Sequence, residues 1–288
     1  MKILMIGAHQ DDNEFRVGGL AHKYVKMGYE VRFLSLTNGC GGHHIMTPAE
    51  TTARRAKESA AVAELLGIRY DQWTDMNDCT LMPTLENRRR LIRYIREFSP
   101  DLIMSHRSND YHADHRAAGM LVQDASYMLI VPHECPDVPA MTTTPVIMYY
   151  EDGFKDPDFH ADIVVDMDDE NDFKLQIAHL NVSQVYEWLP FTKGYEAEVP
   201  ESEEERFEWL KGPYKITPES TDEEILSASR GGSGYDLRNA QTASRFRKEL
   251  IERYGEERGS KIRYAEAFQL CPYGGALTEE LKEKLFSF

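Results

Sequence analysis

The chain has 288 residues, 41% of them hydrophobic and 28% charged, an ordinary composition for a globular protein with a substantial core. Its formal net charge of −16 argues against non-specific binding to nucleic acid and against docking on anionic membranes. The apolar stretches are far shorter than the roughly 20 residues that a membrane helix needs, so we expect no membrane span and a cytoplasmic location. The four cysteines form no C-x-x-C pair, which argues against a disulfide framework and a thiolate zinc site.

Strand-like and helix-like segments alternate through the first two thirds of the chain. The expected strands cover residues 3–8, 30–37, 69–73, 101–105, 146–150 and 163–165. The expected helices cover residues 18–27, 48–66, 85–98, 116–129 and 169–187. Because consecutive parallel strands are joined by right-handed helical crossovers, this alternation predicts an α/β, Rossmann-like fold. Its sheet should be largely parallel and flanked by helices, with a C-terminal extension.

The composition changes in the last third of the chain. Between residues 196 and 224 eleven acidic residues face three basic ones, which indicates a solvated excursion or a lid rather than a partner-binding segment. Residues 239–254 have a helical pattern, and residues 264–270 form either a strand or the entry to a final helix. We therefore expect an α/β core at residues 1–190 and a C-terminal segment at residues 191–288 that packs on it.

A histidine and two acids follow the first expected strand. Residues 8–14 read AHQDDNE, where a nicotinamide-binding fold would carry the glycine pattern GxGxxG. Open α/β sheets place their ligand sites at the carboxyl ends of parallel strands. His9 and Asp12 can both face one point where the chain turns into a helix, and Asp11 remains as a spare acid. Taken alone, this spacing is more typical of a helix-capping pair than of a metal site.

A second group of histidines and acids follows the fourth expected strand, in the run SHRSNDYHADHR over residues 105–116. Because it also lies at a strand's carboxyl end, the two clusters can meet across the rim of the sheet. His112 or His115 would complete a set of two histidines and one carboxylate with the first cluster. Such a set suits catalytic zinc with an open position for water, and also non-haem iron. Asp11 could then accept a proton from the activated water, and the remaining histidine could donate one.

Together the two motifs resemble the PIG-L/LmbE-like family of zinc-dependent de-N-acetylases. The resemblance consists of AHQDDNE at residues 8–14, NDYHADHRA at residues 109–117 and a tail of the form AEAF at residues 265–268. Apart from that tail, it covers roughly residues 1–190. Gln10 departs from the family's usual proline or alanine, but no expected metal ligand is altered. The resemblance implies a metal-dependent hydrolase that removes an N-acetyl group from an N-acetylglucosamine-type sugar or conjugate.

The resemblance also implies a role for individual residues. His9, Asp12 and His115 would hold the metal, with Zn²⁺ as the expected ion and Fe²⁺ as the alternative. Asp11 would be the general base, and His112 would stabilise the oxyanion or protonate the leaving amine. The expected substrate contacts are Arg55, Tyr111, His43 and His44. For the arginine and the loop histidines among these contacts, a plain solvent-exposed position is the alternative.

Two other functions stay open at this stage. The same metal centre could act on a non-sugar N-acyl substrate, because the pocket walls rather than the metal ligands select the substrate. A non-catalytic sugar-binding protein that keeps the fold is the second alternative, and the presence of Asp11 argues against it. The expected partner is a small N-acetylated molecule. The oligomeric state is left open, and a homo-oligomer is compatible with the sequence.

Overall fold

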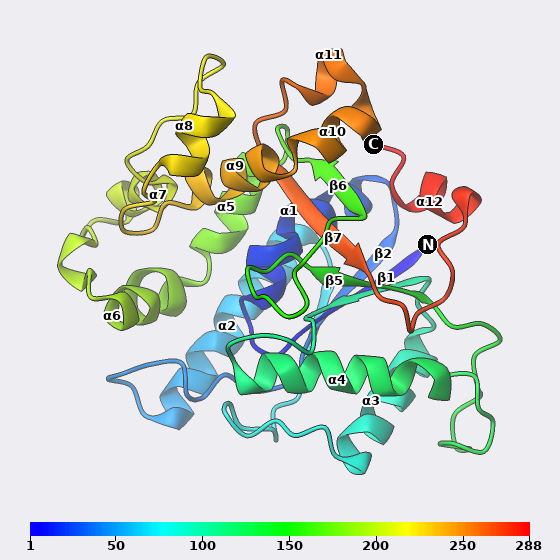
Figure 1. The fold of residues 1–288 in the computed structure, drawn as a ribbon. Helices are drawn as coiled ribbons and strands as arrows, with labels where there is room; N and C mark the ends of the chain where they lie inside the picture. The colour runs from blue at the N-terminus through cyan, green and yellow to red at the C-terminus, as the bar shows by residue number, and fades with distance from the viewer.

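The computed structural model describes residues 1–288, and its centre is a seven-stranded mixed sheet (Figure 1). The strands are β1 (Lys2–Gly7), β2 (Glu30–Ser35), β3 (Arg69–Gln72), β4 (Leu102–Ser105), β5 (Val146–Tyr150), β6 (Ile163–Asp166) and β7 (Ala265–Leu270). They lie in the order β3-β2-β1-β4-β5-β7-β6. All pairs from β3 to β5 are parallel, and β7 runs antiparallel to both of its neighbours. The predicted α/β fold with a largely parallel sheet is confirmed.

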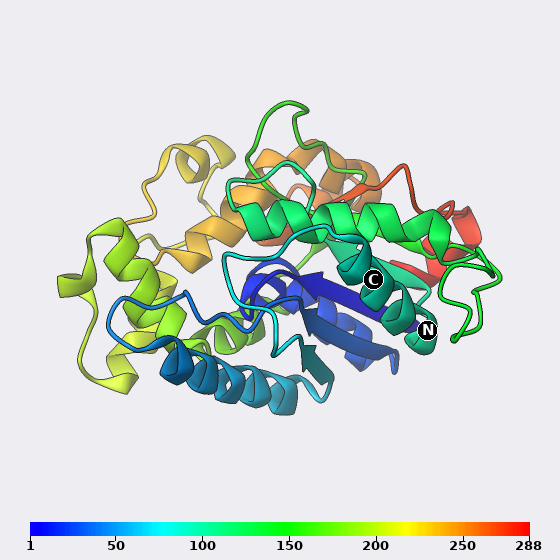
Figure 2. The same ribbon diagram turned by 90° about the horizontal axis from the view of Figure 1, so that it is seen from below.

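Helices pack on the sheet, and the short helical segments between residues 184 and 227 lie to one side of it (Figures 1 and 2). The longer ones are α1 (Asp12–Lys26), α2 (Pro48–Leu66), α3 (Leu85–Phe98), α4 (Ala113–Met128) and α5 (Asn171–His179). The later ones are η1 (a π-helical turn, Gln184–Trp188), α6 (Leu189–Lys193), η2 (a 3-10 turn, Glu196–Glu198), α7 (Glu203–Lys211), α8 (Asp222–Ser227), α9 (Tyr235–Arg245), α10 (Arg247–Tyr254), α11 (Glu256–Gly259) and α12 (Glu279–Leu285). No helix combines the length and the apolar character needed to cross a bilayer.

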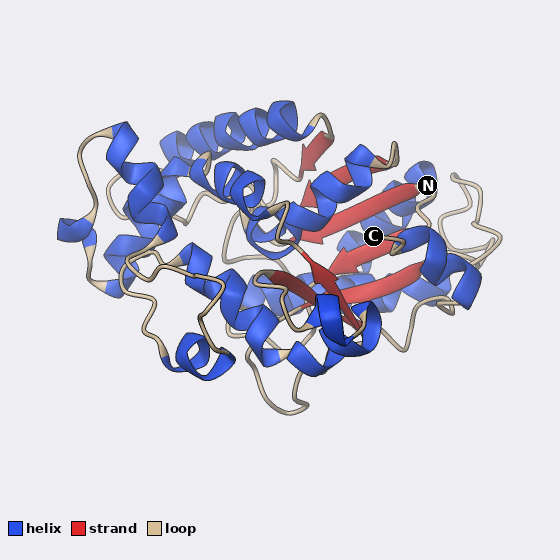
Figure 3. Cartoon of the chain, turned by 90° about the horizontal axis from the view of Figure 1, so that it is seen from above, coloured by secondary structure: helices blue, strands red, loops and turns tan.

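Successive residues of β1 point into two different hydrophobic layers. Ile3 and Met5 lie in a core shared with α1, α2 and α12, whereas Leu4 and Ile6 lie in a core shared with α3 and α4. Figure 3 shows the sheet with helices on both sides. Because both faces are covered, the central strands are apolar throughout. Polar side chains on these strands can therefore reach a ligand only from the strand ends.

Helix α1 begins at Asp12, before its predicted start at residue 18, and the glycine pair Gly18-Gly19 lies inside it. The helix is kinked at Val17, whose φ of −138° is not helical. At the kink the amides of Gly19 and Leu20 donate to the two carboxylate oxygens of Glu266 on β7, each over 3.0 Å. A Cβ atom at Gly19 would lie 2.7 Å from a neighbouring methionine sulfur. The glycine therefore serves a close contact between α1 and β7.

The single helix predicted for residues 169–187 is wrong, because α5 and η1 are separate elements. Between them, Ser183 donates through its backbone amide and its hydroxyl to the carboxylate of Glu58 on α2, over 2.8 and 2.6 Å. Because the amide of Ser183 donates to another helix, it is not available for the hydrogen bonds of one continuous helix. The local sequence pattern does not reveal such a tertiary contact.

The last third of the chain joins the sheet again at β7. The acidic stretch 196–224 contains η2, α7 and part of α8, and the predicted helix over residues 239–254 is divided into α9 and α10 at Phe246. Residues 265–270 form a strand, so the strand is the correct one of the two predicted outcomes. The boundary near residue 190 between a core and an extension stays a prediction.

Candidate metal centre and its cavity

The first cluster occupies the turn from β1 into α1. Asp11 precedes the helix with a φ of 126°, a conformation that non-glycine residues rarely adopt. Asp12 opens the helix, and its Oδ2 accepts a hydrogen bond from the backbone amide of His9 over 2.8 Å. A Cβ atom on Gly7 would lie 2.8 Å from the Cβ of Asp12, so this tight turn requires glycine there. Strain of this kind costs about 1–3 kcal/mol and is concentrated at functional sites.

The second cluster occupies the turn from β4 into α4. His106 directly follows β4, and the chain then loops to His112, which precedes the first residue of α4. The Nδ1 atom of His112 accepts a hydrogen bond from the amide of Asp114 over 3.2 Å, as a helix-capping side chain does. His115 lies one turn into the helix and is buried.

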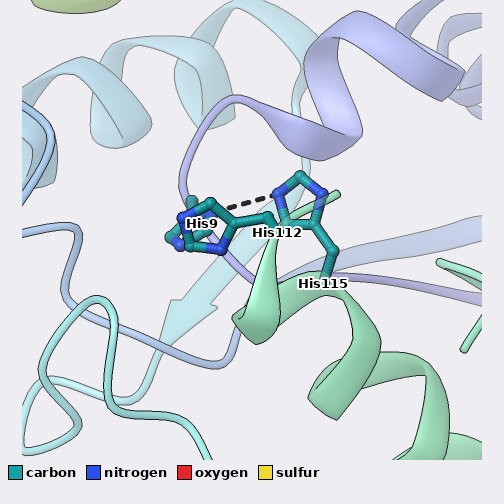
Figure 4. Close-up of side chains that lie close together, drawn as sticks. All are labelled: His9, His112 and His115. Atoms are coloured by element: carbon teal, nitrogen blue, oxygen red, sulfur yellow. Dashed lines mark hydrogen bonds between the residues drawn. The ribbon is translucent and has the colours of Figure 1, made fainter. Parts of the chain in front are cut away.

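The two clusters meet, as expected from their places at strand ends. His9 Nδ1 lies 3.2 Å from His115 Nε2, and His115 Nε2 lies 3.3 Å from Asp12 Oδ1. His9 Nδ1 is 3.6 Å from Asp12 Oδ2. Figure 4 shows the imidazoles of His9, His112 and His115 gathered together, with a dashed line between His9 and His115. The structure thus brings the three predicted ligands to one point, while their role as ligands stays a prediction.

Outer carboxylates fix the orientation of the two histidines. Asp110 Oδ1 lies 3.0 Å from His115 Nδ1, which leaves His115 Nε2 directed at the shared point. On the other side, His9 Nε2 lies 3.0 Å from Asp78 and 3.2 Å from Asp114. Histidines that bind metals commonly donate their second ring N–H to a carboxylate in this way.

The charges of the cluster shift the pKa values of its members. Although burial disfavours the charged form of Asp12, the neighbouring His115 and His106 lower the pKa of Asp12 well below its ordinary value. Burial also disfavours the cation of His115, yet Asp12 and Asp110 raise the pKa of His115 to about 9. Without a metal, these shifts favour a protonated His115 beside an ionised Asp12. A divalent cation at this point would replace that proton, because ligand histidines bind metals in their neutral form.

Asp11 lies beside this cluster and is paired with Arg55. The distance from Asp11 Oδ1 to the Arg55 guanidinium is 3.1 Å. Burial raises the pKa of Asp11 to about 6, against the lowering effect of Arg55. Arg55 also donates to the carbonyl of Gln10 and is almost fully buried. It therefore holds the backbone of the turn from β1 into α1. Its predicted contact with substrate stays a prediction.

The cluster opens into a cavity of about 710 Å³. One wall carries residues of the two motifs, namely His9, Asp11, Asp12, Tyr111, His112 and His115. The facing wall comes from η1, α6, α9 and the loop before α9. Tyr111 is exposed, and its ring centroid lies 5.4 Å from that of His115.

His43 and His44 do not line this cavity. His43 Nε2 lies 2.8 Å from a carboxylate oxygen of Glu187, and its Nδ1 accepts from the amides of the following turn. His44 stacks on Phe191 with 3.9 Å between ring centroids. Both histidines thus hold the loop after β2 against η1 and α6. Their predicted substrate contacts stay predictions.

Two residues at the centre were given no role by the sequence reasoning. His106 Nε2 lies 3.1 Å from Asp12 Oδ2, and its ring stacks on His115 at 4.2 Å. His106 follows the end of β4, just as His9 closely follows the end of β1. Since ligand sites lie at the carboxyl ends of parallel strands, its position in the sequence could have indicated it. Asp78 comes from the irregular loop after β3, where no sequence pattern marks it.

Comparison with known proteins gives a consistent result. Residues 4–126 match the model of the PIG-L family, described as GlcNAc-PI de-N-acetylase. A diacetylchitobiose deacetylase of Thermococcus kodakarensis is 32% identical over 125 residues, 42% of this chain and 47% of that protein, so the match spans about half the length of this relative. A 4-oxalmesaconate hydratase of Pseudomonas putida is 24% identical over 198 residues, which cover 66% of this chain and 76% of that protein.

The fold itself has solved counterparts. The structure of N,N′-diacetylchitobiose deacetylase from Pyrococcus horikoshii superposes with a TM-score of 0.64 at 23% identity, covering 94% of this chain and 84% of that one. Fold and site together define an α/β protein with paired histidine–aspartate clusters at the carboxyl edge of a parallel sheet. Residues 4–126 thus match the family that the resemblance of the two motifs implied.

Proposed function

We propose that this protein is a metal-dependent hydrolase that removes the N-acetyl group from an N-acetylglucosamine-type sugar or conjugate. The observation that carries the proposal is the meeting of His9 Nδ1, His115 Nε2 and the Asp12 carboxylate, 3.2 to 3.6 Å apart, at the edge of a cavity. Two histidines and one carboxylate are a common ligand set of catalytic zinc, and Fe²⁺ accepts the same set. The names of the family and of the deacetylase relatives support an acetamide as the bond that is cleaved.

The residues present fit a divalent metal. The two ring nitrogens face one point, and each second ring nitrogen has a carboxylate within 3.2 Å. When bound, the metal would polarise the acetyl oxygen and lower the pKa of water at the site. The three expected ligands offer nitrogen and oxygen atoms, so a hard or borderline cation is favoured over a thiolate-preferring one.

Asp11 and His112 would move the protons. The Asp11 carboxylate, held by Arg55, would accept a proton from the attacking water. Because His112 Nδ1 accepts from the amide of Asp114, a neutral His112 carries its proton on Nε2. That Nε2–H group is free to donate to the developing oxyanion or to the leaving amine. Positioned acids and bases of this kind contribute about 10²–10⁴-fold to a rate.

The test is metal analysis coupled to a screen for amine release. The purified protein would be loaded with Zn²⁺ or Fe²⁺ and offered N-acetylated sugars in parallel with N-acyl amino acids. We expect about one tightly bound metal per chain and amine release from the sugars. Amine release from the amino acids alone would favour the non-sugar alternative. Metal binding without amine release from any substrate would refute the proposal.

A second candidate function is suggested by the relationship to the 4-oxalmesaconate hydratase. The same centre would then direct water to a carbon–carbon double bond of an unsaturated acid rather than to an amide. The same acid and base would serve, because adding water also needs one proton removed and one donated. Loss of ultraviolet absorbance of 4-oxalmesaconate without amine release from any acetamide would favour this candidate.

A further inference from the structure

The cavity beside the metal cluster is lined by four cations from separate elements. Arg16 extends from α1, Lys193 from the end of α6, Arg230 from the loop before α9, and Arg238 from α9 itself, and all four line the cavity. Their positions in the sequence are far apart, so the fold rather than a basic run assembles them. The cluster, here called the cationic wall, occurs in a chain with a net charge of −16. The overall charge of the chain therefore does not explain why four cations gather in this cavity.

None of these four side chains forms an ion pair. Arg16 donates to the backbone carbonyl of Glu151 over 2.7 Å, and Arg230 donates to the side-chain oxygen of Gln241 over 2.8 Å. The side chains of Arg238 and Lys193 make no hydrogen bond in this structure. Lys193 and Arg230 are exposed, whereas Arg16 and Arg238 are partly buried. A guanidinium group that is partly removed from water without an ionic partner is unfavourable, so Arg238 would gain most from a bound anion.

The nearby acids are already engaged. Glu151 pairs with Arg245 through one oxygen and accepts from Thr242 over 2.7 Å through the other. Glu266 is paired with Lys174 over 2.8 Å. The eleven acids of residues 196–224 lie in the neighbouring segment, yet none of them forms an ion pair with the cationic wall.

Mutual repulsion and partial burial act on the same residues. Burial lowers the pKa of Arg238 to about 10, and the neighbouring Arg16 lowers it further. Burial and then Arg238 lower the pKa of Lys193, and burial and Arg245 lower that of Arg230. Each cation would gain from an anion placed among them. Arg16 lies one helical turn, about 6 Å, beyond Asp12, so such an anion would be near the metal centre.

We propose that Arg16, Lys193, Arg230 and Arg238 form an anion subsite that binds a carboxylate or phosphate group of the substrate. The inference rests on the proposed function only in taking the same cavity as the place where substrate binds. It specifies the substrate class: an N-acyl compound with an anionic group, rather than a neutral sugar. Guanidinium groups bind both anions through paired hydrogen bonds, so either source of charge fits this wall.

The test compares N-acetylated sugars with and without an anionic group. Metal-loaded protein would receive N-acetylglucosamine, N-acetylglucosamine 6-phosphate and N-acetylmuramic acid, which carry no anion, a phosphate and a carboxylate. We expect kcat/KM to be at least about tenfold higher for one anionic substrate than for the neutral one. In Arg238→Gln this ratio should fall by about 10- to 100-fold through KM, the range expected for a lost charged hydrogen bond.

Arg93→Gln is the matched control, because it removes an equal charge on α3, where Arg93 pairs with Asp137 outside the cavity. It should leave the ratio unchanged. An equal kcat/KM for charged and neutral substrates, or an equal fall of the ratio in both variants, would overturn the subsite.

A binding measurement separates failure of the subsite from failure of the proposed function. Titration calorimetry with inorganic phosphate and with succinate needs no turnover. Binding to the parent protein that is lost in Arg238→Gln supports the subsite even if no amine is ever released. Amine release from neutral sugars, together with no binding of either anion, would leave the proposed function standing and refute the subsite. A thermal melt of each variant shows that it is folded.

Discussion

At the ends of β1 and β4 the charged side chains are paired with one another, whereas the four residues of the cationic wall have no ionic partners. Asp12 contacts His106 and His115, and Asp11 is paired with Arg55. Arg238, by contrast, forms no ion pair or side-chain hydrogen bond. Groups that are already paired keep their geometry before any ligand arrives, and unpaired groups gain a partner only from the ligand. On the two proposals above, the contrast separates a preorganised metal centre from a wall that would bind the anionic group of the substrate.

The largest effect is expected within the preorganised centre itself. Asp11→Asn should lower kcat by about 10²–10⁴-fold while the bound metal remains, because only the proton acceptor is lost. Asparagine also tolerates the positive φ at this position, so the turn should survive. Asp12→Asn should lose the metal as well. Metal content and amine release, measured on both variants, check the assignment, and equal metal loss in the two would contradict it.

Removal of the metal should destabilise the whole protein. If free Zn²⁺ is held at 100 times its dissociation constant, chelation should lower the free energy of unfolding by about 2.7 kcal/mol. The physical reason is that only the folded chain brings His9 and His115 together with Asp12. Urea unfolding with and without chelator measures the change. Asp12→Asn serves as the control, and a response of that variant equal to the parent's would point to a metal bound elsewhere.

Loss of an outer carboxylate should weaken metal binding without abolishing it. Asp110→Asn removes the negative charge that orients His115, and the metal affinity should fall by about 10- to 100-fold. Competition with a chromophoric chelator provides the measurement. Asp124→Asn, at an exposed position of α4, removes an equal charge near Arg88 and should leave the affinity unchanged.

The smallest effect tests the cationic wall by stability rather than by activity. Arg238→Gln should leave the free energy of unfolding unchanged or raise it by up to about 1 kcal/mol, since it relieves repulsion between unpaired cations. Urea unfolding of this variant is compared with that of Arg93→Gln, which loses a surface ion pair and should be slightly destabilised. A fall of more than about 1 kcal/mol in Arg238→Gln would mean that the arginine is needed for folding.

The same two walls differ in what the sequence could predict. The motif wall follows two strand ends, and strand ends in a parallel sheet meet at one edge, so the proximity of His9 and His115 could be expected. Elements with clear caps, such as the helix over residues 48–66 and the helix over residues 85–98, begin and end where the sequence predicts. There the decisive signals are local.

The cationic wall could not be predicted, because its signals are not local. Arg16 and Arg238 are ordinary helix arginines in the sequence, and only the packing of α9 beside the sheet brings them into one cavity. The early start of α1 could not be predicted for a similar reason. The backbone at the glycine pair is held by hydrogen bonds to Glu266, a residue far along the chain. Asp78 lies in a loop without any periodic pattern.

The place of β7 in the sheet has a consequence for how the chain matures. In the strand order β5-β7-β6, β6 is hydrogen-bonded to β7 and not to β5. Glu266 of β7 also accepts hydrogen bonds from the two amides at the kink of α1 and forms an ion pair with Lys174. During synthesis the metal-binding motif is made first, yet its helix gains these partners only when residues 265–270 have left the ribosome. The folded site should therefore be complete only after translation of this late strand.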